Sequence, residues 1–232
     1  IGQVLKRGKG KVFAIGRQTA LVRAAAEIKK ANFVILAVKP QNAREVVAQF
    51  KNYLRKDAVL ISIMAGISIK KLTSLSGHKK IIRLMPNLGL TLGEGIAVWK
   101  ASGLSRIELA KSKKFLDKIT ENFEIKTEDD INKVTAISGS GPAYFFLLAD
   151  SLVRACGDLG FSAEDSRKLV GKTFRAAAIL STEGDYTTLI KKIASKKGTT
   201  EAAVKVFKKK NFEKIVQQAV RAAYKRAKAL SR

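Results

Sequence analysis

The chain has 232 residues, with 45 Lys and Arg against 19 Asp and Glu, and so carries a formal net charge of +26. Its 46% hydrophobic content supports one large or two modest folded domains and excludes a disordered chain or a small disulfide scaffold. The single cysteine, Cys156, excludes an internal disulfide and a cysteine-rich zinc site and suits a reducing compartment, so we expect a cytoplasmic protein. The longest apolar run, Ala58–Ile67, is shorter than the roughly 20 residues of a membrane span.

Short apolar runs alternate with helical patterns in the first half of the chain. The runs predict strands at Phe33–Val38, Val59–Met64, Ile81–Leu84 and Gly95–Trp99. Helical periods predict helices at Asn42–Arg55, Ser68–Leu75 and Ser105–Thr120. Upstream, we expect a further strand at Lys11–Ile15 and a helix at Thr19–Lys30. This alternation predicts an α/β layer with a parallel sheet and crossover connections.

Only helical periods remain after about Lys126, with helix starts near Ser162, Asp185, Thr199 and Asn211. We therefore predict two domains, an α/β domain over residues 1–126 and an all-α domain over residues 127–232. The segment Ala143–Cys156 is apolar on nearly every side, which is typical of a helix in a bundle or a subunit interface. We expect a dimer for this reason, because one small helical domain offers little to cover such a helix.

The sequence offers no obvious hydrolytic machinery. His78 is the only histidine, which excludes most Ser-His-Asp arrangements and His-rich metal sites, and we expect it in a surface loop. Residues Glu128, Asp129 and Asp130 are typical of the negatively charged start of a helix. No metal site is expected.

Backbone features suited to anions remain. Lys39-Pro40, Ala65-Gly66 and Pro86-Asn87 each follow a predicted strand, and the carboxyl ends of parallel strands form the ligand edge of an open sheet. Together they predict a nucleotide cleft. In Ser138–Pro142 we expect a tight helix start with Ser140 as its cap. Ser195–Thr200 opens a helix with a glycine, hydroxyls and lysines, a combination typical of a carboxylate or phosphate site.

Four segments, taken in order, resemble the signatures of the pyrroline-5-carboxylate reductase family. They are Ala37–Gln41, Ile81–Asn87, Val134–Tyr144 and Ser195–Val204. The resemblance runs from about Phe33 to the end of the chain. It implies a Rossmann-like domain followed by a helical domain that forms a homodimer, often within a larger ring.

By this resemblance the protein is an oxidoreductase that reduces a cyclic imine, pyrroline-5-carboxylate, to proline with NADPH or NADH. Such a hydride transfer needs little side-chain chemistry, because the nicotinamide carries the reactivity and the protein positions it. Ser195 and the backbone N–H groups of Gly198, Thr199 and Thr200 are expected to hold the substrate carboxylate, and the Thr200 hydroxyl to act near the imine nitrogen. The residues expected to line the cofactor cleft are Ala37, Val38, Lys39, Pro40, Ala65, Gly66, Pro86 and Asn87.

The chain also departs from the family pattern. Lys196-Lys197 stand where the family commonly has Pro-Gly, and Leu88-Gly89 replace the usual Thr-Pro. Nothing before Phe33 matches the family's opening strand and its G-x-G-x-x-G-like turn, although Arg17 is placed for a 2′-phosphate in one alignment. We therefore expect a Rossmann-like domain that lacks its first βα unit, an amino-terminal truncation, and weak NADPH binding by this chain alone.

Two other functions stay open at this point. A reductase-like fold without catalysis, serving as an interaction protein, would fit a missing phosphate loop. The positive charge, concentrated in residues 1–93 and 191–232, also allows nucleic-acid binding, although Phe145, Phe146 and Phe207 lie in apolar stretches rather than among the basic residues. A solvated basic surface explains the charge more simply.

Overall fold

The computed structural model describes residues 12–16 and 21–231, and the chain divides into two compact units. The first comprises the chain up to Ser140 together with the segment from Arg221 onward, and the second comprises Gly141–Val220. In this division residues 127–140 lie with the α/β unit, whereas the expected helical domain begins at residue 127. The reason is that the helix at Glu128–Val134 packs on the sheet through the fully buried Ile131, so it belongs with the α/β unit.

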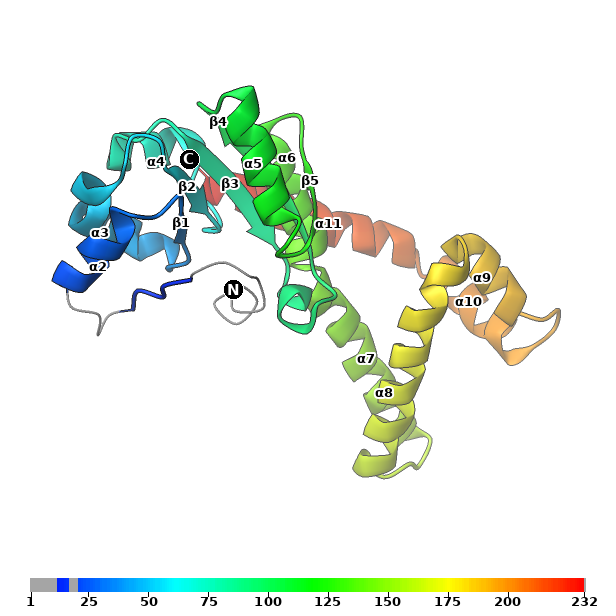
Figure 1. Cartoon of the computed structure of the whole chain (residues 1–232). Coiled ribbons are helices and arrows are strands. Elements are labelled where there is room, and N and C mark those ends of the chain that lie inside the picture. Colours follow the sequence, from blue (N-terminus) through cyan, green and yellow to red (C-terminus); the bar gives the residue numbers. More distant parts are fainter. Residues whose placement is uncertain (1–11, 17–20, 232) are drawn as a thin grey trace. The chain divides into compact units, whose positions relative to one another are not determined.

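A five-stranded sheet forms the first unit, with its strands in chain order across the sheet (Figure 1). The strands are β1 (Phe33–Leu36), β2 (Val59–Ser62), β3 (Ile81–Pro86), β4 (Ile96–Ser102) and β5 (Glu121–Glu124). Strands β1, β2 and β3 are parallel, β4 is antiparallel to β3, and β5 is parallel to β4. Leu36, Ser62 and Arg83 lie side by side across the three parallel strands.

The structure confirms the four strands predicted at the apolar runs and the parallel pairing of the first three. Two expectations were wrong. Residues 12–15, where a strand was expected, have no regular structure, and β4 reverses direction because only the short 3₁₀ segment η3 (Leu88–Leu92) separates it from β3. Strand β5 was missed, since two of its four residues are glutamates and three are exposed.

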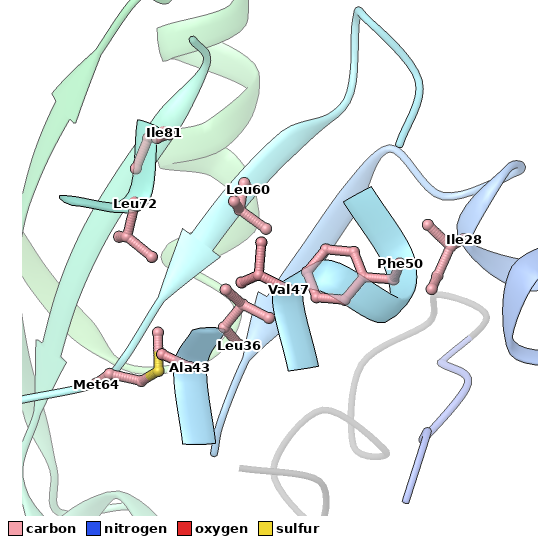
Figure 2. Packing of buried hydrophobic residues seen from close by; sticks show 9 residues of the cluster. All are labelled: Ile28, Leu36, Ala43, Val47, Phe50, Leu60, Met64, Leu72 and Ile81. Atoms are coloured by element: carbon pink, nitrogen blue, oxygen red, sulfur yellow. The ribbon is translucent and has the colours of Figure 1, made fainter. Parts of the chain in front are cut away.

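Helices cover both faces of the sheet, and the side chains of each strand alternate between two apolar clusters. The helices of this unit are α2 (Leu21–Ile28), α3 (Ala43–Phe50), α4 (Ile69–Ser76), α5 (Arg106–Leu116) and α6 (Glu128–Val134), with 3₁₀ turns η1 (Pro40–Asn42) and η2 (Lys51–Tyr53). Figure 2 shows one cluster, in which Leu36 and Leu60 pack against Val47 and Phe50 of α3. On the other face Ile61, Ile82 and Trp99 pack against Leu116 of α5. These clusters fix the strand ends that carry the expected cofactor residues.

Side-chain caps start several helices where the sequence predicted them. The Ser68 side chain accepts a hydrogen bond from the Lys71 N–H at the start of α4, and Ser162 does the same for Asp165 ahead of α8. His78, expected at the surface, is buried instead. Its Nε2 lies 2.7 Å from the Ala58 carbonyl oxygen, a contact across the sheet edge that local sequence does not reveal.

The second unit is helical. It holds α7 (Gly141–Asp158), α8 (Ala163–Leu180), the 3₁₀ turn η5 (Ser181–Glu183), α9 (Tyr186–Ile193), α10 (Thr199–Lys209) and the first part of α11 (Phe212–Leu230). The apolar segment expected in a bundle or an interface lies in α7, where Phe145, Phe146 and Leu147 are more than half exposed in the single chain. A face of this kind marks an interface with another chain. Within the described residues, no helix is long and apolar enough to cross a membrane.

Candidate active site

The expected cofactor residues lie at the carboxyl ends of three adjacent parallel strands. After β1, Ala37, Lys39 and Pro40 are exposed, and Lys39 has the extended backbone that a following proline imposes. Lys39 forms no ion pair with any described residue. Half-buried Val38 packs against the apolar cluster beneath. This loop therefore presents backbone and a free cation toward solvent.

The loop after β2 is held close to the end of the chain. Gly66 has φ of +74°, and a Cβ atom placed on it would lie 2.8 Å from Leu230 Cβ and 2.9 Å from the Leu230 carbonyl oxygen. Glycine is therefore required both by conformation and by the approach of Leu230. Ala65, beside it, is half-buried.

Asn87 has a part in the architecture that the sequence did not indicate. Pro86 pairs with Ala97 as the last residue of β3. The Asn87 Oδ1 atom accepts a hydrogen bond from the Ile96 N–H at 3.2 Å, and Nδ2 donates to Ser138 Oγ at 3.2 Å. Both ends of its amide are thus used to join the start of β4 to the segment that follows α6.

That segment is a single π-helical turn, η4 (Thr135–Gly139). The Ser140 N–H donates to the Thr135 carbonyl oxygen at 2.9 Å, and the Ser140 hydroxyl donates to the same oxygen at 3.2 Å. Ser140 therefore closes the π turn, and the expectation that it caps the next helix was wrong. Turns of this kind are frequent at functional sites.

The described part of this edge suits a dinucleotide. Ala37, Val38, Lys39, Pro40, Ala65 and Gly66 include one cation and no carboxylate, and they lie where open α/β sheets bind nucleotides. Arg17, expected near a 2′-phosphate, lies outside the described residues, and so do Gly2, Gly8 and Gly10, the glycines of the opening segment that do not form the family's glycine-rich turn.

The expected substrate residues lie in the second unit, at the amino end of α10. Gly198 is the N-cap and offers no side chain, and the N–H groups of Thr199 and Thr200 have no partner among the described residues. The hydroxyls of these two threonines form no hydrogen bond within the same part of the chain. Two free N–H groups and two free hydroxyls at a helix amino end are suited to a carboxylate.

The Gly198 N–H group is not free, in contrast to the expectation that it binds the substrate. It donates to the Ser195 carbonyl oxygen at 3.0 Å. A Cβ on Gly198 would lie 2.4 Å from Ser195 Oγ, which a rotation of that side chain relieves, and 3.0 Å from the Ser195 carbonyl oxygen, so a larger residue would crowd the turn. Ser195 itself is exposed, and Gly198 serves the loop by shaping it.

Glu201 completes this loop and was missed at the sequence level. Its Oε2 accepts a hydrogen bond from the Lys197 N–H at 2.7 Å, and this bond, aided by Lys205, lowers the pKa of the Glu201 carboxyl. Lys197 has φ of +63°, a left-handed conformation, at the position where the family commonly has glycine. A glutamate three residues after the helix cap was the available signal.

Comparisons with known proteins agree with this geometry. Residues 128–230 match the family described as pyrroline-5-carboxylate reductase dimerisation, and residues 4–66 match the family described as NADP oxidoreductase, coenzyme F420-dependent. The pyrroline-5-carboxylate reductase of Pseudomonas aeruginosa is 34% identical over 211 residues, covering 89% of this chain and 77% of that protein. The corresponding reductase of Haemophilus influenzae is 34% identical over 206 residues, covering 87% of this chain and 76% of its own length.

Solved structures give the same result. The pyrroline carboxylate reductase of Plasmodium falciparum, with NADP bound, has a TM-score of 0.80 and 30% identity, covering 97% of this chain and 86% of its own. That of Coxiella burnetii also has a TM-score of 0.80 and 30% identity, covering 90% and 79%. Fold and site define a Rossmann-type NAD(P)-dependent oxidoreductase with a helical dimerisation region. The chain belongs to the pyrroline-5-carboxylate reductase family.

Proposed function

We propose that this protein reduces pyrroline-5-carboxylate to L-proline, with NADPH or NADH as the hydride donor, and so serves proline biosynthesis. The free N–H groups of Thr199 and Thr200 at the start of α10 carry this proposal, in a chain 34% identical to a pyrroline-5-carboxylate reductase over 211 residues. The cyclic imine carries one carboxylate, which is the group that a helix amino end binds best.

The dinucleotide supplies the hydride when it is bound. The loops after β1 and β2 would hold it, with the Ala37–Pro40 backbone contacting it and the Lys39 ammonium favouring its negative charge. Gly66 lets the second loop turn tightly at the same edge. Pro86 and Asn87 set the third strand end, and Asn87 acts by joining β4 to the π turn.

The substrate is held at the amino end of α10. The N–H groups of Thr199 and Thr200 bind the carboxylate, and the positive end of the helix dipole favours the anion. The Thr200 hydroxyl hydrogen-bonds at the imine nitrogen and supports its protonated form, which accepts the hydride. Ser195 and Gly198 shape the loop that presents these groups.

The protein works as a homodimer through the exposed apolar helices of the second unit. The proposed compartment is the cytoplasm, where Cys156, free in the structure, would stay reduced.

Loss of NADPH absorbance on adding pyrroline-5-carboxylate tests the function. We expect a rate that saturates with the imine, and proline formed in equal amount to the NADPH consumed. An open-chain ketoacid of similar size is the control substrate and should leave NADPH unchanged. Absence of proline at saturating NADPH and imine would contradict the proposal.

A further inference from the structure

A buried arginine interrupts the apolar strand β3. The Arg83 side chain is 3% exposed, and its Nη1 donates to Glu128 Oε1 of α6 at 2.9 Å. Its Nη2 lies 3.3 Å from Ser231 Oγ, near the carboxyl end of the chain, while Nε has no partner among the described residues. The Glu128 side chain is 31% exposed and one guanidinium nitrogen is unsatisfied, so this ion pair contributes little net stability, and stability alone explains the buried arginine poorly.

Glu128 makes a second contact, and it is with the cofactor edge. The oxygen that receives Arg83 also accepts a hydrogen bond from the Ile69 N–H at 2.8 Å. Ile69 is the first residue of α4, directly after the loop Ala65–Ser68, which lies between β2 and α4. The Glu128 carboxylate thus joins the carboxyl end of that loop to α6 and to β3.

The end of α11 fixes the entrance of the same loop. Leu230 lies against Gly66, as described above. The Tyr224 hydroxyl donates to Asp129 Oδ2 at 2.5 Å, and Ser231 Oγ donates to Asn132 Oδ1 at 2.9 Å, so two hydrogen bonds hold the end of α11 on α6. Both ends of the Ala65–Ser68 loop are therefore restrained by residues far away in the sequence.

We propose that Arg83, Glu128 and the Leu230–Ser231 end of α11 form a loop bracket, whose purpose is to hold the Ala65–Ser68 loop in the shape that binds the dinucleotide. Glu128 is then a positioning residue that acts on NADPH affinity through this loop, without touching substrate. The inference rests on the proposed function, because it takes the dinucleotide to be the ligand of this sheet edge.

The Glu128→Ala variant tests the bracket. We expect faster hydrogen exchange at the Ile69 amide and an NADPH dissociation constant raised by about tenfold, the scale of one hydrogen bond to a charged group. NADPH fluorescence titration without imine measures this. The KM for the imine should stay within about twofold, because the Glu128 side chain accepts hydrogen bonds from Ile69 and Arg83, next to the cofactor loop, and not from the substrate loop. Glu128→Gln keeps an acceptor for Ile69 and should recover most of the affinity.

Glu108 provides a matched control. It also accepts a hydrogen bond from a main-chain N–H, that of Ser105 at 2.8 Å, and forms an ion pair with Lys80. Lys80 directly precedes β3, so this pair lies at the amino ends of the parallel strands, away from the cofactor loops. Glu108→Ala should leave NADPH affinity unchanged. If Glu128→Ala proves unstable, Ser231→Ala removes the hydroxyl contacts to Arg83, Asn132 and the Ala227 carbonyl oxygen and should raise the dissociation constant about threefold.

Three results would contradict the bracket. The first is unchanged NADPH affinity in Glu128→Ala despite faster hydrogen exchange at Ile69. The others are an equal loss of NADPH affinity in Glu108→Ala and a wild-type chain with no measurable NADPH affinity. Failure of the proposed function is distinguishable, because a chain that binds NADPH but forms no proline still shows whether Glu128 sets that affinity.

Discussion

The carboxylate of Glu201 accepts a hydrogen bond from the backbone N–H of Lys197 at 2.7 Å, and this bond closes the loop that leads into α10. Lys205 lies one turn further along, with its Nζ 3.3 Å from Glu201 Oε1. The first two N–H groups of α10 are the proposed hydrogen-bond donors to the substrate carboxylate. The bond between Glu201 and Lys197 therefore orients the substrate loop and leaves those two N–H groups free.

Loss of the Glu201 charge should weaken this loop. The Lys197 N–H, and secondarily Lys205, lower the pKa of Glu201 below its usual 4.5, so its ionised form stabilises the folded state. That contribution is complete above about pH 4.5 and is lost as the pH falls through the lower folded pKa. We expect Glu201→Gln to raise the KM for the imine several-fold at pH 7 and to flatten the acid limb of a thermal-stability profile. An acid limb identical to wild type would contradict this role.

Lys197 holds a backbone conformation that glycine adopts more easily. The left-handed conformation of Lys197, with φ of +63°, destabilises the folded state by roughly 1–2 kcal/mol relative to glycine. Glycine recovers only part of this, because its unfolded state has more conformational entropy to lose on folding. Lys197→Gly should therefore raise the free energy of unfolding by up to about 1 kcal/mol, measured by urea denaturation at fixed protein concentration. A less stable variant would show that the lysine side chain contributes more than its backbone costs.

Gly66 and Gly77 allow the approach of Leu230 to be measured separately from backbone conformation. Both have positive φ, +74° and +70°, but a Cβ on Gly77 meets nothing within 4 Å. Gly77→Ala should cost about 1 kcal/mol of stability, whereas Gly66→Ala should cost clearly more, about 2–4 kcal/mol, because it pushes against Leu230. Equal costs in urea denaturation would mean that the end of α11 moves away freely.

The exposed face of α7 should be needed for assembly. Leu147 is 68% exposed in the single chain, and Leu147→Asp would place a charge in the apolar dimer interface. Size-exclusion chromatography with light scattering should show a monomer or a much weaker dimer. Val22→Asp, at an even more exposed apolar residue of α2 in the first unit, is the control and should remain dimeric. A fully dimeric Leu147→Asp would place the interface elsewhere.

Much of the architecture was predictable because its signals are local. The short run Ile81–Leu84 predicted a strand, helical periodicity predicted the helix at Ser68–Leu75, and Ser162 predicted a helix start through cap chemistry. Strand β5 was not predictable in this way, since it is short, acidic and mostly exposed, and it pairs only because β4 offers an edge.

Some features of the candidate site could likewise be predicted from the sequence and others could not. The strand-end loops and the helix start after Ser195 could be inferred from turn residues and from the family resemblance. The contacts that shape them could not, since Arg83 meets Ser231 across 148 positions and Asn87 meets Ser138 across 51. A charged residue inside an apolar strand was the one local hint that Arg83 has distant partners.

The central claim depends most directly on Thr200. We would compare proline formation by wild type, Thr200→Val and Thr187→Val at saturating NADPH, because Thr187 occupies the equivalent second position of α9 and has no proposed role. We predict a kcat lower by about 10²-fold or more in Thr200→Val, the scale of losing one group that assists proton transfer, with Thr187→Val near wild type. Proline formation by Thr200→Val at the wild-type rate would contradict the account.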